Sequence, residues 1–247
     1  MENLKAIILA AGKGTRMAVD GRDVPKVLRT VLGRPMLDYV LRATPVERQE
    51  DAVIVVGYKR ELVEAAFPGR TFAVQAQQLG TGHAVMSAEE ALAGWQGDVL
   101  ILCGDTPLVR RETLEALVED HRARGSVCTV LAGASREPMK GLGRVKQKPD
   151  GSFDAIVEER DCTPEELAIQ VYNSGIYVFR APYLFSALHR LKTDNAQGEY
   201  YLTDAPYILL KDGLKVGVSV LDMGPELLGV NSPAELAQAE RLLQGGN

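Results

Sequence analysis

The stretch AIILAAGKGTRM, residues 6–17, joins an apolar run to a loop that is rich in glycine and basic residues. The apolar run predicts a buried strand, and a glycine-rich loop directly after a strand exposes successive backbone N–H groups. Together with Lys13 and Arg16, such groups can bind an anion. The stretch therefore predicts an α/β protein with an anion-binding loop after its first strand. An ordinary strand-to-helix turn with solvated charges is the alternative.

Two known phosphate-binding motifs do not fit this loop. The dinucleotide motif G-x-G-x-x-G fits Gly12 and Gly14 but requires a third glycine where Met17 stands. The P-loop motif requires Gly-Lys-Ser/Thr after four free positions, whereas the sequence continues Lys13-Gly14-Thr15-Arg16. The loop therefore belongs to neither motif.

The composition is that of a soluble globular protein. The 247 residues are 46% hydrophobic and 25% charged, which suits one large α/β domain or two small ones. The sequence has no apolar run near the roughly 18 residues that a membrane span needs, and a start containing Glu2 does not resemble a signal peptide. We therefore expect a cytoplasmic protein with no membrane partner. Three cysteines without a C-x-x-C spacing argue against a disulfide framework and a zinc site.

Charge is distributed unevenly along the chain. The net charge is −5, which disfavours a nucleic-acid partner, yet the segment from Lys13 to Arg34 carries a net +4. A confined basic patch suits a small polyanionic ligand. Within it, Arg22, Arg29 and Arg34 are the first candidates for plain solubility charges.

Apolar runs alternate with helical patterns, which is typical of βα units and a mostly parallel sheet. Expected strands are 4–10, 51–57, 70–76, 98–105 and 126–133, and expected helices are 36–43, 60–66, 83–92 and 111–123. From about residue 137, two strands around the Pro149-Asp150-Gly151 turn and an extended stretch at 169–181 indicate a mixed or antiparallel sheet beside the first. The segment NSPAELAQAERLLQ at 231–244 predicts a last helix, with Ser232 as N-cap, Pro233 at the first helical position and Glu235 three residues after the cap. We expect a Rossmann-like, mostly parallel mixed sheet with helices on both faces and a smaller antiparallel portion.

Polar residues follow three of the expected strands. The segments are AAGKGTR at 10–16, QAQQLGTG at 75–82 and CGDTPL at 103–108. Ligands of open α/β sheets bind beyond the carboxyl ends of the strands. The basic segment is suited to bind phosphate, the amide-rich segment a ring with hydrogen-bonding groups, and the acidic segment a divalent metal.

A family resemblance follows from a set of motifs that covers essentially the whole chain. In order they are LAAGKGTRM, PKVL at 25–28, QLGTGHA at 78–84, GDTPL, GRV at 143–145, IVEERD at 156–161, NSGIY at 173–177, NAQGEYYLTD at 195–204 and GVNS at 229–232. In this combination the chain resembles the bacterial N-acetylglucosamine-1-phosphate uridylyltransferases. The first motif is shared among sugar nucleotidyltransferases, whereas QLGTGHA with NAQGEYYLTD is typical of the uridylyltransferase branch.

The resemblance implies the substrates UTP and N-acetylglucosamine 1-phosphate, the cofactor Mg²⁺ and a role for each of several residues. The catalytic residues would be Arg16 and Lys26, which would contact the triphosphate. The nucleotide would be bound by Leu9, Ala10, Ala11, Gly12, Gly14, Lys26, Gln75, Gly80 and Thr81. Mg²⁺ would be held by Asp105 and Asn231. The sugar would be bound by Gly143, Glu158, Asn173 and Asn231, with Thr203 or its neighbours.

The whole chain, 1–247, is then one nucleotidyltransferase domain whose part after about residue 137 binds the sugar. Cys103 stands where family members often have Tyr, and the segment between Met17 and Val24 is longer than usual. No role is assigned to the three histidines. The family's bifunctional members continue into a hexapeptide-repeat β-helix that this sequence lacks, so we expect a monomer. A glucose-1-phosphate nucleotidyltransferase and a catalytically silent nucleotide-sugar-binding module are the alternatives.

Overall fold

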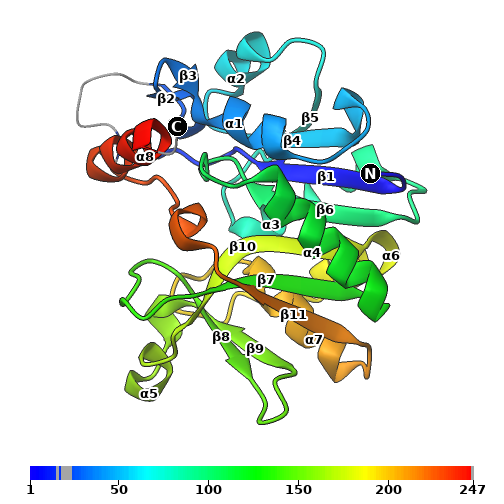
Figure 1. Ribbon diagram of the computed structural model, residues 1–247. Coiled ribbons are helices and arrows are strands. Elements are labelled where there is room, and N and C mark those ends of the chain that lie inside the picture. The colour runs from blue at the N-terminus through cyan, green and yellow to red at the C-terminus, as the bar shows by residue number, and fades with distance from the viewer. Residues whose placement is uncertain (15–16, 18–23, 246–247) are drawn as a thin grey trace.

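The protein is described by a computed structural model that covers residues 1–14, 17 and 24–245 (Figure 1). Its centre is a nine-stranded mixed sheet whose main path runs β11-β7-β10-β6-β1-β4-β5. The strands of this path are β1 (Leu4–Leu9), β4 (Ala52–Val56), β5 (Thr71–Val74), β6 (Asp98–Cys103), β7 (Cys128–Ala134), β10 (Val171–Arg180) and β11 (Val216–Leu221). β2 (Thr30–Val31) and β3 (Arg34–Pro35) form a separate two-stranded ribbon.

Helices connect the strands. They are α1 (Met36–Ala43), α2 (Arg60–Ala66), α3 (Thr81–Met86), α4 (Arg111–Arg124), α5 (Pro164–Leu167), α6 (Ala181–Leu188), α7 (Ala205–Lys211) and α8 (Pro233–Gly245). The helices expected at 36–43 and 60–66 agree with the structure at both ends. The helix expected at 83–92 does not: α3 starts earlier and ends at Met86, and a separate 3-10 helix follows at Glu90–Leu92.

The antiparallel strand β10 is inserted in the sheet, not placed beside it as expected. It pairs antiparallel with β6 on one side and with β7 on the other. β1, β4, β5 and β6 pair in parallel, as do β7 and β11. The expected mixed, mostly parallel sheet is therefore confirmed, but one strand of the chain's second half joins its two parallel parts.

Successive side chains of a strand point to opposite faces of the sheet, and both faces are covered by helices (Figure 1). Ile8 belongs to an apolar cluster with α1, α2 and α4, whereas Ile7 belongs to a cluster with α3, α6 and α7. Ile7, Ile8, all of β4 and the apolar residues 99–102 of β6 are buried. This two-sided burial explains why the central strands are continuous apolar runs.

Local signals in the second half are confirmed as well. β8 (Arg144–Gln147) and β9 (Phe153–Val157) form an antiparallel hairpin around Gly151, which adopts a positive φ of 79°. β8 also pairs with β10, so the hairpin is attached to the main sheet. α8 begins after Ser232, whose Oγ accepts a hydrogen bond from the Glu235 N–H at 3.3 Å. Among the described residues, no helix is long and apolar enough to cross a membrane.

Candidate active site

A cavity of about 250 Å³ lies at the carboxyl ends of β1, β5 and β6. Of the residues expected to bind nucleotide or metal, residues 9–12, Lys26, Gln75, Gly80, Thr81 and Asp105 line it. Four separate segments of the sequence thus meet at one point, because strands that run in parallel end at the same edge of the sheet. Arg16 lies outside the described residues, so its expected position is untested.

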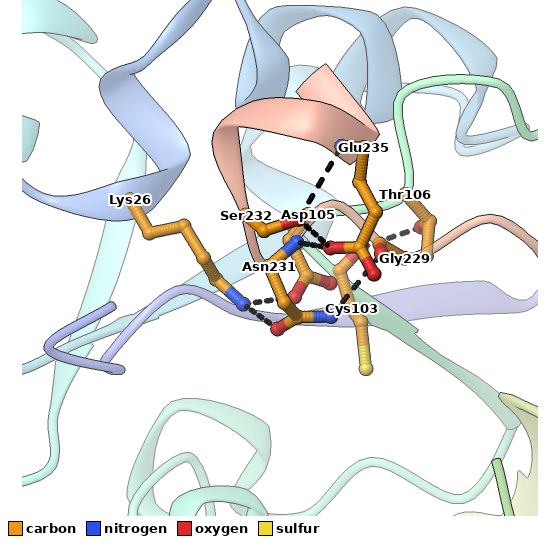
Figure 2. Close-up of polar contacts among 8 residues, drawn as sticks. All are labelled: Lys26, Cys103, Asp105, Thr106, Gly229, Asn231, Ser232 and Glu235. Atoms are coloured by element: carbon orange, nitrogen blue, oxygen red, sulfur yellow. Dashed lines mark hydrogen bonds and ion pairs between the residues drawn. The ribbon is translucent and has the colours of Figure 1, made fainter. Parts of the chain in front are cut away.

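Lys26, Asp105 and Asn231 form a polar cluster at this edge (Figure 2). The Lys26 ammonium forms an ion pair with Asp105 Oδ2 and donates to Asn231 Oδ1 at 2.8 Å. The side chains of Lys26 and Asp105 are only 15% and 18% exposed, so the ion pair is largely shielded from water. Two oxygens from distant parts of the chain therefore converge on a single cation.

This oxygen pair has the chemistry that Mg²⁺ requires. Magnesium prefers hard oxygen ligands and is usually bound by one or two protein oxygens, several waters and a substrate phosphate. The ammonium of Lys26 marks a position where a cation is already stabilised by both oxygens. The described residues contain no group of three or more His, Cys, Asp or Glu side chains arranged to hold a metal ion. A carboxylate with an amide oxygen is therefore the donor set that this site offers.

Asn231 is held in place by the start of α8. Glu235 Oε2 accepts hydrogen bonds from the Asn231 N–H at 2.7 Å and from Ser232 Oγ at 2.9 Å. The Asn231 amide nitrogen donates to the Gly229 carbonyl at 3.1 Å, which leaves the amide oxygen facing Lys26. The hydrogen bonds at the expected start of α8, at Ser232, therefore also orient Asn231, the expected metal ligand.

Asp105 lies two residues after the end of β6. The N–H of Val230 donates to the Asp105 carbonyl at 2.9 Å, so this backbone contact joins the segment before α8 to the end of β6. Cys103, the last residue of β6, lines the cavity, and burial together with the charge of Asp105 raises the pKa of its thiol to about 12. The thiol is therefore neutral near pH 7 and acts as a packing group, not as a nucleophile.

Gln75 and Gly80 both line the cavity and are hydrogen-bonded to each other. Gln75 is 4% exposed, and its Nε2 lies 3.0 Å from the Gly80 carbonyl oxygen and 3.1 Å from His83 Nδ1. His83 belongs to α3, and its ring stacks on Tyr200 with 6.4 Å between the ring centroids. The Gln75 amide is therefore fixed by two partners.

The two motifs that are typical of the uridylyltransferase branch are hydrogen-bonded to each other. The Tyr200 N–H donates to the Leu79 carbonyl at 2.9 Å, and the Gly82 N–H donates to the Tyr200 carbonyl at 2.8 Å. Gly80 has a φ of +111°, and a Cβ added there would lie 2.7 Å from the Tyr200 carbonyl oxygen. Only glycine allows this approach, which brings Glu199 to the cavity wall.

The expected sugar-binding residues are grouped away from the lining of this cavity. Thr203 Oγ1 donates to Glu158 Oε1 at 3.1 Å. Burial raises the pKa of Glu158 against the effect of that hydrogen bond, and the charge of Asp161 raises it further. A carboxyl group in a partly buried site can accept hydrogen bonds from hydroxyl groups.

Asn173 and Gly143 are close neighbours. The Asn173 N–H donates to the Gly143 carbonyl at 2.9 Å. The Asn173 side chain is 6% exposed, donates to the Tyr177 hydroxyl at 2.7 Å and accepts from the Gly175 N–H at 3.3 Å. A Cβ added at Gly175 would lie 3.4 Å from Cys103 Sγ, so this group adjoins the nucleotide side of the site at Cys103.

One expectation about the first basic segment needs correction, and another stays a prediction. Gly14, expected to contact the nucleotide, is not among the residues that line the cavity; it has a φ of +61° and packs so closely on Lys26 that a Cβ would lie 2.6 Å from the Lys26 Cβ. Arg29 is not a plain solubility charge, because it is 8% exposed and its Nη2 donates to the Met17 carbonyl at 3.0 Å. Both residues support the segment that carries Lys26.

The sequence analysis assigned no role to several residues that line the cavity. These are Val27, Gln78, Ala84, Cys103 and Glu199. Gln78 belongs to the motif QLGTGHA and Glu199 to the motif NAQGEYYLTD, so both could have been named as candidates from the sequence. No role was assigned to His83, and only the tertiary structure shows its contact with Gln75.

A mixed α/β sheet with a polar cavity at its carboxyl edge is typical of an α/β protein that binds a small ligand there. The family model for the MobA-like NTP transferase domain matches residues 6–204, and the chain belongs to that family. The bifunctional protein GlmU of Streptococcus suis (strain 98HAH33) is 46% identical over 99% of this chain and 52% of its own length. The corresponding protein of Pelobacter propionicus is 45% identical over 99% and 53%. The chain thus spans about half the length of the curated relatives it matches.

The fold is shared with a solved structure of low sequence identity. A UDP-glucose pyrophosphorylase complexed with UDP-glucose superposes with a TM-score of 0.75 at 18% identity, over 98% of this chain and 99% of that one. At this identity the match shows the common architecture alone.

Proposed function

We propose that this protein is a magnesium-dependent uridylyltransferase that forms UDP-N-acetylglucosamine and pyrophosphate from UTP and N-acetylglucosamine 1-phosphate. The observation that carries the proposal is the convergence of Lys26, Asp105 and Asn231 beside the cavity lined by residues 9–12. A binding module without activity has no need of a shielded cation next to two metal-binding oxygens. The similarity to the bifunctional GlmU proteins, at 46% identity over nearly the whole chain, supports the same reaction.

The chemistry requires positioning and charge neutralisation more than proton transfer. The phosphate of the sugar is already an anionic nucleophile, and it attacks the α-phosphorus of UTP in line with the departing pyrophosphate. Lys26 would stabilise the negative charge that develops on the triphosphate, and Arg16 would assist it. Lys26 directly follows Pro25, whose restricted φ of −50° fixes the direction from which the side chain enters the site.

Asp105 and Asn231 would hold the magnesium ion. When bound, magnesium neutralises phosphate charge and orients the reacting groups. The residues fit this role because their oxygens already converge on a cation. Asn231 is kept in the required orientation by Glu235 and Gly229, so the amide oxygen presented to the site is defined before any ligand arrives.

The remaining residues would select the two substrates. The backbone of Ala11, Gly12 and Gly80 and the amide of Gln75 lie around the cavity and suit a base with both donor and acceptor groups. Glu158, with Thr203 and Asn173, would bind the hydroxyl and acetamido groups of the sugar on the side of Cys103.

The test is a turnover assay that measures pyrophosphate release from each of the four nucleoside triphosphates with several sugar 1-phosphates. UTP with N-acetylglucosamine 1-phosphate is expected to give the highest kcat/KM. An equal or higher value with glucose 1-phosphate would show that the sugar is wrongly assigned. Absence of turnover with every pair, with UDP-N-acetylglucosamine still bound, would favour the silent binding module.

A further inference from the structure

The Gln75 amide has a fixed orientation because of what it contacts. A backbone carbonyl can only accept a hydrogen bond, so the group that faces the Gly80 oxygen at 3.0 Å is the amide nitrogen. The same nitrogen lies 3.1 Å from His83 Nδ1, which accepts its second hydrogen when the imidazole is neutral and carries its proton on Nε2. Both N–H groups of the amide are therefore used inside the protein.

The amide oxygen is the atom that remains for a ligand. Within the described part of the chain, no group donates a hydrogen bond to Gln75 Oε1. Gln75 lines the cavity and is 4% exposed, so a base that reaches this side chain meets an acceptor with no water to compete. The neighbouring backbone N–H groups of Ala11, Gly12 and Gly80 donate to no other described residue and can complement the acceptors of the same base.

His83 is itself held in position by its surroundings. Its ring stacks on Tyr200 at an interplanar angle of 29°, an arrangement within the range of favourable aromatic pairs. The Tyr200 backbone is bonded on both sides to the segment that precedes and begins α3, through Leu79 and Gly82. The Nδ1 atom that receives the Gln75 hydrogen is therefore part of a rigid unit.

We propose that His83 is a positioning residue for base selection: by occupying the second N–H of Gln75, it leaves only an acceptor oxygen for the nucleotide. This inference rests on the proposed function, in that the nucleotide base occupies the cavity beside Gln75. Uracil carries an N–H at ring position 3 and pairs with such an acceptor. Cytosine carries a lone pair at the same position, so the two acceptors would repel each other.

A matched pair of variants tests the role of the Nδ1 acceptor. His83→Leu removes it, and His83→Asn restores an acceptor oxygen at nearly the same distance from the backbone. For His83→Leu, the ratio of kcat/KM for UTP to that for CTP is expected to fall by about tenfold or more, because the freed N–H can serve the wrong base. The change should lie in KM for both nucleotides, with kcat for UTP altered by less than about threefold. His83→Asn should keep most of the wild-type ratio.

Controls separate this role from a structural one. His189→Ala removes an exposed histidine whose ring contacts Glu89, and it should leave the ratio and both constants unchanged. An equal loss of kcat/KM for UTP and CTP in His83→Leu, or an unchanged ratio, would overturn the proposal. Failure of His83→Asn to restore the ratio would overturn it as well.

A measurement on the unaltered protein does not depend on how the variants fold. Nitrogen-15 NMR of the imidazole should show His83 as the neutral form protonated on Nε2, with Nδ1 accepting a hydrogen bond. A proton on Nδ1 would overturn the proposal even if UTP is the preferred substrate. If the wild-type protein does not use UTP but His83 shows the expected form and UDP binds more tightly than CDP, the proposed function fails and the role of His83 stands.

Discussion

The amide oxygen of Asn231 lies 2.8 Å from the ammonium group of Lys26, although 205 positions of sequence separate the two residues. The same ammonium is paired with the carboxylate of Asp105. Lys26 therefore occupies the point at which the two proposed metal ligands converge. If magnesium is to use these oxygens, Lys26 has to leave them, and the phosphates of the incoming nucleotide offer it an alternative partner.

Replacing Lys26 with methionine should separate metal binding from turnover. In Lys26→Met, the two oxygens lose their internal cation, so free Mn²⁺ should bind more tightly in the absence of nucleotide. Turnover should nevertheless fall, because the positive charge beside the triphosphate is gone. Electron paramagnetic resonance of free Mn²⁺ measures the affinity directly. Lys146→Met, which breaks the ion pair with Glu166, is the control, and unchanged or weaker Mn²⁺ binding by Lys26→Met would contradict this account.

The contact between Gly80 and Tyr200 predicts a costly substitution. Gly80→Ala places a Cβ 2.7 Å from the Tyr200 carbonyl oxygen at a φ of +111°, so both strain and overlap oppose folding. We expect a loss of about 2–5 kcal/mol in the free energy of unfolding, together with a raised KM for UTP. Gly69→Ala, at a φ of +78° with open space around it, should cost only about 1–2 kcal/mol. Equal losses in the two variants would show that the contact between the loops contributes nothing.

The carboxylate of Asp98 predicts a dependence of stability on pH. Burial alone would raise its pKa, but the His121 ring, whose Nε2 lies 3.5 Å away, and the hydrogen bond from Arg122 at 2.7 Å outweigh burial and lower the pKa below its ordinary value of 3.8. A lowered pKa in the folded state means that the stabilisation is complete above pH 3.8 and is lost as the pH falls through the folded-state pKa.

The matching experiment compares Asp98→Asn with the wild-type protein. The variant should be less stable by about 1.5 kcal/mol at pH 7, and the difference should shrink as the pH is lowered below about 4. Thermal unfolding across this range measures it. Asp212→Asn, which breaks a more exposed pair with Arg190, should have a smaller effect. A difference that stays constant or widens in acid would contradict the assigned contacts.

Sequence patterns predicted the parts of the fold that depend on local interactions. The helices at 36–43 and 60–66 and the cap at Ser232 follow from apolar spacing and capping residues within a few positions. The insertion of β10 between β6 and β7 could not be read in this way. Its partners are distant in sequence, and an apolar extended stretch carries no information about which strands it will join.

The same distinction applies to the site. The strand ends and motifs predicted that residues 9–12, Gln75 and Asp105 would meet, because parallel strands end at one edge. Burial of Arg29 and the contact of His83 with Gln75 depend on packing between segments, which residue type and spacing do not specify. Asn231 was named through the resemblance alone, since its local sequence reads as a simple turn before a helix.

The central claim is that Asp105 holds the magnesium ion that assists nucleotidyl transfer. The most direct test compares Asp105→Asn with the wild-type protein across a magnesium titration. Asparagine keeps the size of the side chain and an oxygen toward Lys26, so the fold should be retained, with thermal unfolding as the check. Loss of the carboxylate should lower kcat/KM by about a hundredfold or more, equivalent to about 2.7 kcal/mol of transition-state stabilisation, and should raise the magnesium concentration required. Rates near those of the wild-type protein at low magnesium would contradict the claim.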